Sequence, residues 1–126
     1  MSIKGQLARY IYRRMIGLYA YASMELPYQP TLIQLLEESG RGLSKEMKNN
    51  VKAANRAFQQ LIDQDVLLKV EESKRVKKGK SLLNIHYNLY PTRILVDEII
   101  QANIKQKELK DLINRRRMKE IKDSLK

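Results

Sequence analysis

Two basic segments of the sequence hold the side chains best suited to bind a ligand. The first is a predicted helical stretch whose polar side carries Lys45, Lys48, Asn49, Lys52 and Arg56. The second is the tip of a predicted hairpin, which carries Lys74, Arg75, Lys77, Lys78 and Lys80. Cationic side chains neutralise phosphates and release condensed counterions, and asparagine pairs with adenine edges. Both segments therefore favour a nucleic-acid partner, with double-stranded DNA in first place.

The overall charge points to the same class of partner. The 126 residues include 25 Lys and Arg against 14 Asp and Glu, a formal net charge of +11. The length allows one small domain with a modest core and an appended helix. The absence of cysteine excludes disulfides, thiolate metal sites and Cys nucleophiles. With no membrane-length apolar run and no signal peptide, we expect a cytoplasmic protein, associated with the nucleoid or a plasmid.

Catalytic constellations are missing from the sequence. His86 is the single histidine, so it has no second imidazole with which to hold a metal ion. The five glycines are scattered and form no phosphate-binding loop. The adjacent pairs Glu37-Glu38 and Glu71-Glu72 point in different directions, and no Ser stands beside a His base. We expect no enzyme activity, no metal, no cofactor and no small-molecule substrate.

The first half of the chain reads as two helices and a turn. Apolar residues recur at spacings of three and four from Leu7 to Met24, a first helix that Pro27 and Pro30 end. Its apolar side includes Leu7, Ile11, Met15, Leu18 and Ala22. A short, heavily apolar second helix covers Thr31 to Glu38. Gly40-Arg41-Gly42 then predicts a turn, because glycine permits positive φ values.

The third helix and the hairpin follow. Ser44 is the predicted N-cap of a helix from Lys45 to about Asp65. An apolar stripe opposes the basic face and comprises Met47, Val51, Ala54, Phe58, Leu61 and Ile62. Strands are predicted at Val66 to Val70 and at Leu82 to Leu89. Their basic connection is longer than a two-residue turn, so we expect a mobile tip.

A long C-terminal helix completes the prediction. Thr92 is a plausible N-cap, the helix starts at Arg93, and apolar spacing continues to Leu125 with a break near Gln106. Such a helix is too long for so small a domain to bury. Its distal half is expected to dock on a protein partner or a sister chain in a homodimer, with a solvated helical tail as the alternative. The predicted division is therefore residues 1–91 as a DNA-binding domain and residues 92–126 as a helical extension.

This order of elements predicts a mainly α protein with a small β-hairpin (α+β), organised as a winged helix-turn-helix with a long C-terminal helix. In that fold the start of the third helix enters the major groove. We assign base contacts to Lys48, Asn49 and Lys52. Lys45, Arg56 and Ser44 are assigned to phosphates, Ser44 together with the helix N-terminus. The hairpin lysines and Arg75 would lie along the backbone or in the minor groove.

A further pattern runs from Arg9 to Tyr90. It comprises Tyr19 to Tyr21, Leu26-Pro27-Tyr28, Leu32 to Leu36, Lys45 to Arg56, Ala57 to Leu61 and Asp65 to Leu67. This pattern resembles the winged-helix domains of plasmid replication initiator proteins, most nearly those of the TrfA type. In that family, paired winged helices bind repeated origin sites, so the resemblance implies that Lys45 to Arg56 reads one repeat. This chain has one winged helix and a long C-terminal helix outside that pattern, which leaves plasmid replication initiation and transcription regulation both open.

Two alternatives remain open at this point. A protein-interaction module would use the basic surface to meet an acidic protein and the last helix as its binding element. An RNA-binding protein would stack bases on tyrosines. The tyrosines gather in the first helix, where we expect core packing, so this second alternative ranks lower.

Overall fold

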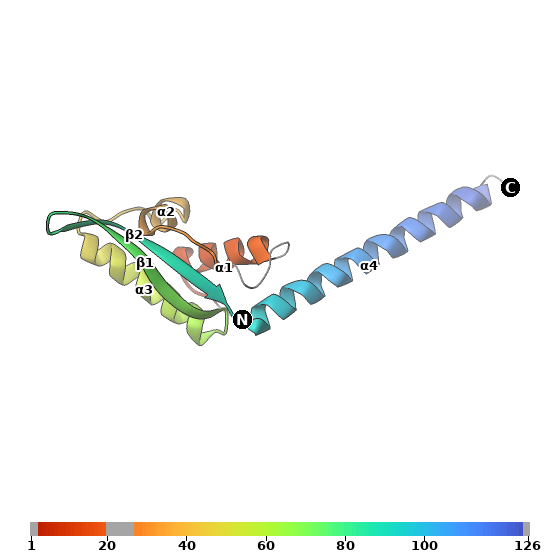
Figure 1. Cartoon of the computed structure of the whole chain (residues 1–126). Coiled ribbons are helices and arrows are strands. Elements are labelled where there is room, and N and C mark those ends of the chain that lie inside the picture. The colour runs from red at the N-terminus through yellow and green to blue at the C-terminus, as the bar shows by residue number, and fades with distance from the viewer. Residues whose placement is uncertain (1–2, 20–26, 125–126) are drawn as a thin grey trace.

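The fold joins four α-helices to one antiparallel hairpin within residues 3–19 and 27–124, the part of the chain that this computed structural model describes. In chain order the elements are α1 Gln6–Tyr19, α2 Leu32–Glu38, α3 Met47–Asp63, β1 Leu67–Lys78, β2 Ser81–Pro91 and α4 Arg93–Ser124 (Figure 1). The predicted α+β class, mainly helical with a small hairpin, is confirmed at this level.

The first two helices form as their sequences indicate. In α1 the buried side chains include Leu7, Ile11 and Met15, which recur every four residues along one face. The predicted continuation to Ala22 and Met24 lies outside the described residues. Helix α2 has a capping box: the Gln34 N–H donates to Thr31 Oγ1 at 3.1 Å, and the Thr31 N–H donates to Gln34 Oε1 at 3.4 Å. Gly40 and Gly42 have φ values of 83° and 79°, as the predicted turn requires.

Both strands of the hairpin are longer than predicted, and the turn that joins them is shorter. Its register pairs Leu67 with Pro91 at the base and Lys78 with Ser81 at the tip, so that only Gly79 and Lys80 make the turn. Gly79 has a φ of 62°, which a two-residue turn favours. The predicted short strands and long connection are therefore wrong. Backbone hydrogen bonds to β2 keep β1 extended where its side chains are mostly charged and exposed and show no alternation of apolar and polar residues.

A short extended segment between α1 and α2 pairs with the free edge of β2. Tyr28 exchanges backbone hydrogen bonds with Leu89 at 3.0 and 2.8 Å, and the Tyr87 N–H donates to the Pro30 carbonyl at 3.0 Å. A further bridge joins Thr31 to His86. This pairing was not predicted, because Pro27 before the segment and Pro30 within it suggest only a helix end. It fixes α2 against the hairpin.

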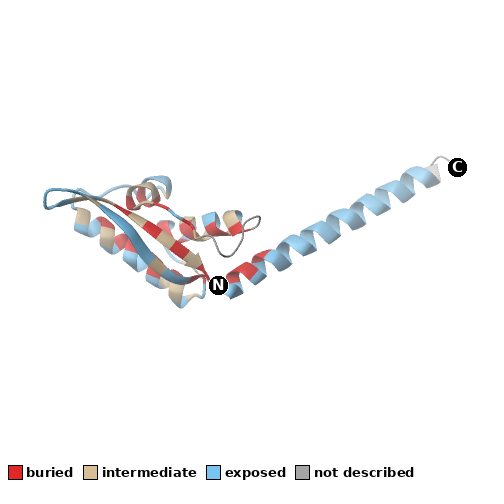
Figure 2. Cartoon of the chain, viewed as in Figure 1, coloured by how far each residue is buried: buried red, intermediate tan, exposed pale blue. Residues whose placement is uncertain are grey.

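The core lies between the helices and the inner face of the hairpin. Tyr87 on β2 meets Phe58 on α3 edge to face, with ring centroids 4.9 Å apart. Figure 2 shows buried residues along the facing sides of α1, α2, α3 and β2. The first turns of α4 add Leu95, Val96 and Ile99 to the buried set.

Helix α4 extends far beyond this core. It continues unbroken to Ser124, so the predicted break near Gln106 is wrong. No glycine or proline occurs between Arg93 and Ser124, which leaves nothing to interrupt the helix. Every residue from Ile100 to Lys122 is exposed. Figure 2 shows this part of α4 projecting away from the rest of the described chain.

Candidate nucleic-acid interface

The two predicted basic segments lie at one end of the molecule. Helix α3 begins near the tip of the hairpin, and α4 leaves from the opposite end of the hairpin (Figure 1). The chain direction explains this placement: β1 runs back along α3, which returns the tip to the end where α3 starts. The charges of α3 and of the tip therefore share a region although they are far apart in sequence.

Helix α3 has one face packed on the core and one face exposed to solvent. Ala54, Phe58 and Leu61 are buried, while Met47, Val51 and Ile62 are partly buried against the core. The five predicted contact residues on the other side are all exposed: Lys45, Lys48, Asn49, Lys52 and Arg56. Lys45 precedes the helix, because α3 begins at Met47 rather than at the predicted Lys45 and ends at Asp63. The division of α3 into a core face and a solvent face is as predicted.

The start of α3 is held in a different way from that predicted. Glu46 is the N-cap residue, and no side chain caps the helix, so the prediction of Ser44 as N-cap is wrong. Instead the Ser44 N–H donates to Asn50 Oδ1 at 2.7 Å, and Asn50 Nδ2 donates to the Ser44 carbonyl at 3.1 Å. Asn50 is 3% exposed and is the one buried polar residue in the described part of the chain. It ties the segment before α3 to the helix and leaves Ser44 exposed.

Asn50 bounds a hollow that sequence reasoning did not identify. The hollow lies at the start of α3 and is lined by Arg41, Gly42, Leu43, Ser44, Asn49 and Asn50. It adds the guanidinium of Arg41, from the turn after α2, to the basic surface. The basic residue between two glycines is the signal that could have marked Arg41, since such turns bring backbone and side chain close to a ligand.

The hairpin charges divide between the two faces of the strands. Residues paired across an antiparallel ladder share a face. Arg75 pairs with the buried Ile85, and Lys77 pairs with Leu82, which packs on the core; both cations are therefore on the α3 side. Lys74 pairs with His86, and Lys78 follows Lys77, so both are on the outer face. Lys80 lies in the turn. The sequence predicted one continuous basic tip, whereas the ladder makes two sets.

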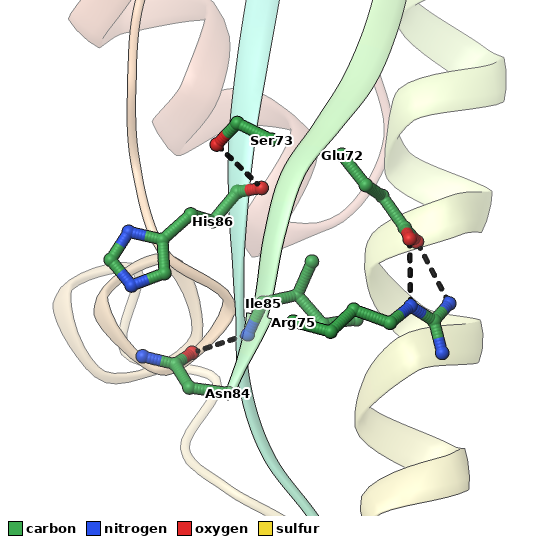
Figure 3. A network of polar contacts seen from close by, with 6 residues as sticks. All are labelled: Glu72, Ser73, Arg75, Asn84, Ile85 and His86. Atoms are coloured by element: carbon green, nitrogen blue, oxygen red, sulfur yellow. Dashed lines mark hydrogen bonds and ion pairs between the residues drawn. The ribbon is translucent and has the colours of Figure 1, made fainter. Parts of the chain in front are cut away.

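Two of the basic residues have acidic neighbours. Arg75 forms a two-pronged contact with Glu72, with Nε and Nη2 donating to the carboxylate at 2.7 and 3.0 Å (Figure 3). This contact lowers the pKa of the Glu72 carboxyl and raises that of the Arg75 guanidinium. Lys48 Nζ lies 3.4 Å from Glu46 Oε2. Both pairs are largely exposed, so each contributes little to stability.

The outer face of the hairpin is polar and ordered by hydrogen bonds. Figure 3 shows Asn84 and His86 pointing away from α3, while Glu72 and Arg75 point toward it. Asn84 Oδ1 accepts from the Ile33 N–H at 3.1 Å, near the start of α2. Ser73 sits at an irregularity of the ladder, and its hydroxyl donates to the His86 carbonyl at 3.3 Å. His86 is thus a strand residue beside α2.

No protein-family model, no curated protein and no solved structure matches this chain. The function proposed for the chain therefore rests on its own geometry and charges.

Two other kinds of site find no support in the described residues. Among residues 3–19 and 27–124, no three His, Asp or Glu side chains gather in a way that could hold a metal ion. Within the same residues, no helix has the length and apolar character needed to cross a membrane.

Proposed function

We propose that this chain is a winged-helix protein that binds double-stranded DNA in a sequence-specific manner. The observation that carries the proposal is that the exposed Lys and Asn face of α3 begins at the same end of the molecule as the basic hairpin tip. A duplex lying across that end would meet both. Arg41, from the turn after α2, would add its positive charge beside this contact.

The order of elements supports the winged-helix assignment. A helix, a short strand, two helices and then a hairpin, with the short strand paired to the second hairpin strand, is the arrangement that positions a recognition helix beside a wing. Tyr28 to Thr31 supplies that short strand by pairing with β2. The turn at Gly40 and Gly42 separates the two helices of the helix-turn-helix unit, α2 and α3.

The proposed contacts follow from the dimensions of B-DNA. Its major groove, about 12 Å wide, admits one α-helix, and side chains near the helix N-terminus reach base edges. We assign base contacts to Lys48, Asn49 and Lys52 on the first turns of α3. Lys45 and Arg56, at either end of this set, are assigned to phosphates. The uncapped backbone N–H groups at the start of α3 and the Ser44 hydroxyl would meet a phosphate there.

The hairpin would add affinity with little sequence preference. Lys77 and Arg75 lie on the α3 side of the strands, and Lys80 occupies the turn. Such cations contact phosphates or enter the minor groove, and their contribution falls as salt rises. We assign Lys74 and Lys78, on the outer face, to the flanking backbone. The biological role that fits is regulation of transcription or initiation of plasmid replication, the latter on the resemblance of residues 9–90 alone.

The proposal is tested by titrating labelled duplex DNA of random sequence with the protein between about 50 and 200 mM salt. Lys45→Ala and Arg56→Ala should each reduce the slope of log affinity against log salt by about one. The matched control is Lys107→Ala, an exposed lysine on α4 that is remote from α3. A slope that falls as much for the control as for Lys45→Ala would mean that bulk charge, and not this surface, binds the duplex.

A second candidate function has its own observation. The exposed apolar residues of α4 give a protein-interaction role to the C-terminal helix, alone or beside DNA binding. If that role were the only one, charge reversal at Lys48 and Lys52 would leave binding to the partner intact and duplex binding would be absent in the titration above.

A further inference from the structure

The exposed part of α4 carries an apolar cluster on one face. Leu109, Leu112 and Ile113 are 58%, 47% and 42% exposed, although each is a large aliphatic side chain. Their spacing of three and four residues places them together on the helix surface. Exposed clusters of this kind are typical of interaction sites.

A groove at the base of α4 has complementary character. It lies between α1 and α4, and Tyr12 and Ile16 line one wall while Ile99 and Ala102 line the other. Glu98, Asn103 and Gln106 also line the groove, so a carboxylate and two amides lie beside the apolar side chains.

The groove and the cluster lie on the same side of one continuous helix. Ala102 and Ile113 are separated by 11 residues, which is about three turns at 3.6 residues per turn. Figure 1 shows α4 as a straight rod over this stretch. Two such helices laid antiparallel can therefore place each Ile113 against the other's Ala102 at the same time.

We infer that the occupant of the groove is a second copy of this chain, bound antiparallel through α4. In this pairing the Leu109 to Ile113 cluster of each copy enters the groove between α1 and α4 of the other. Each contact is made twice around the twofold axis, as in an isologous interface. The inference does not rest on DNA binding.

The charges of α4 select the antiparallel direction. Asp97 and Glu98 are at the base of the helix, and Arg115, Arg116 and Arg117 are in its distal half. Antiparallel pairing with Ala102 opposite Ile113 brings Glu98 of one copy beside Arg116 and Arg117 of the other. Parallel pairing would instead stack six arginines, three from each copy, at an energetic cost.

The same charges argue for a second copy and not for an unrelated protein. One chain supplies both halves of the fit: the aliphatic cluster with the arginines that follow it on α4, and the groove between α1 and α4 with Glu98. A different partner would have to reproduce both halves in the reverse order along its own surface. Only a copy of this chain supplies them automatically.

The oligomeric state tests this inference. Sedimentation velocity of the full chain at high micromolar concentration should give a species of twice the 14.8 kDa chain mass. Ile113→Asp should raise the dimer dissociation constant by about tenfold or more, since it places a carboxylate in an apolar contact. The control is Ile104→Asp, because Ile104 is similarly exposed, at 45%, on the opposite side of α4. A monomeric wild type, or equal effects of the two substitutions, would overturn the inference.

The direction of pairing is tested by disulfide trapping, which is simple because the chain contains no cysteine. Chains carrying Ala102→Cys mixed with chains carrying Ile113→Cys should form a mixed disulfide on oxidation. Neither variant alone should cross-link, since its two cysteines would lie about 16 Å apart along the axis, beyond disulfide reach. Efficient cross-linking of each variant with itself would show a parallel dimer and contradict the proposal.

Discussion

Asn50 holds the backbone of Ser44 from both sides, accepting from its N–H at 2.7 Å and donating to its carbonyl at 3.1 Å. The clamp fixes the segment that leads into α3 and so sets where the first turn of the helix presents its polar side chains. It is made by a residue that packs with the core face and not by one of the exposed residues it positions.

Removing the clamp should therefore cost stability. Asn50→Ala leaves two backbone groups of Ser44 without their partners, and we expect a loss of about 1–3 kcal/mol in the free energy of unfolding. The neighbouring exposed Asn49→Ala is the matched control, with a change within about 0.5 kcal/mol. Urea denaturation measures both. Equal stability of Asn50→Ala and wild type would show that the clamp does not hold the segment.

The clamp also shows what the sequence could and could not predict. The sequence indicates helix starts at Thr31 and Thr92, and both side chains accept from backbone N–H groups three residues on, at 3.1 Å. Ser44 also has a side-chain hydroxyl, yet its backbone is hydrogen-bonded by the buried Asn50, and the helix begins at Met47. N-cap residue types are a local signal, whereas Asn50 acts through tertiary packing.

The sequence does not indicate the full length of β1, for a related reason. Strand β1 continues through Ser73 to Lys78, where every side chain except the half-buried Val76 is polar and exposed, so no apolar alternation marks it. Its order comes from backbone pairing with β2, and β2 shows the alternation that the sequence indicates. The same limitation hid the pairing of Tyr28 and Pro30 with β2, which uses backbone groups beside prolines.

Ionisation of Tyr87 should lower the free energy of unfolding at high pH. Burial, and then the nearby Glu72 carboxylate, raise its pKa from 10 to about 12. Above pH 10 the unfolded chain loses this proton first, so the contribution is complete below that pH and disappears as pH rises toward 12. Tyr87→Phe should reduce the loss of stability between those values, followed by urea denaturation as a function of pH. An unchanged pH profile would rule out this role for Tyr87.

The same substitution should be tolerated at neutral pH. The buried Tyr87 hydroxyl finds no hydrogen-bond partner among the described residues. Replacing it with hydrogen keeps the ring that meets Phe58 edge to face. We expect Tyr87→Phe to be within about 1 kcal/mol of wild type or more stable. A loss well above this would indicate that the hydroxyl is bonded in solution.

Glu72 should oppose DNA binding by occupying Arg75. Glu72→Gln removes a negative charge from the α3 side of the hairpin and releases the guanidinium from its two-pronged contact. We expect tighter duplex binding with a steeper salt dependence, and a small change in stability because the pair is largely exposed. Glu71→Gln, on the outer face beside Lys69, is the control and should have the smaller effect. The reverse ranking would place the duplex on the outer face.

The division of the hairpin lysines gives a second, independent comparison. Lys77 is on the α3 side and Lys74 on the outer face, only three residues away. If the duplex lies across α3, Lys77→Ala should weaken binding more than Lys74→Ala and should reduce the salt slope by about one. Equal losses from the two variants would indicate a long-range effect of charge without a defined contact surface.

The base contacts proposed for α3 require it to read a duplex sequence, which in-vitro selection from random duplex DNA measures. The wild-type chain should enrich a defined motif, and Lys48→Ala and Asn49→Ala should each weaken binding to that motif while leaving binding to unrelated duplexes less affected. Lys107→Ala on α4 should select the same motif as wild type. No enriched motif, or a motif that both α3 variants bind as tightly as wild type does, would contradict the claim.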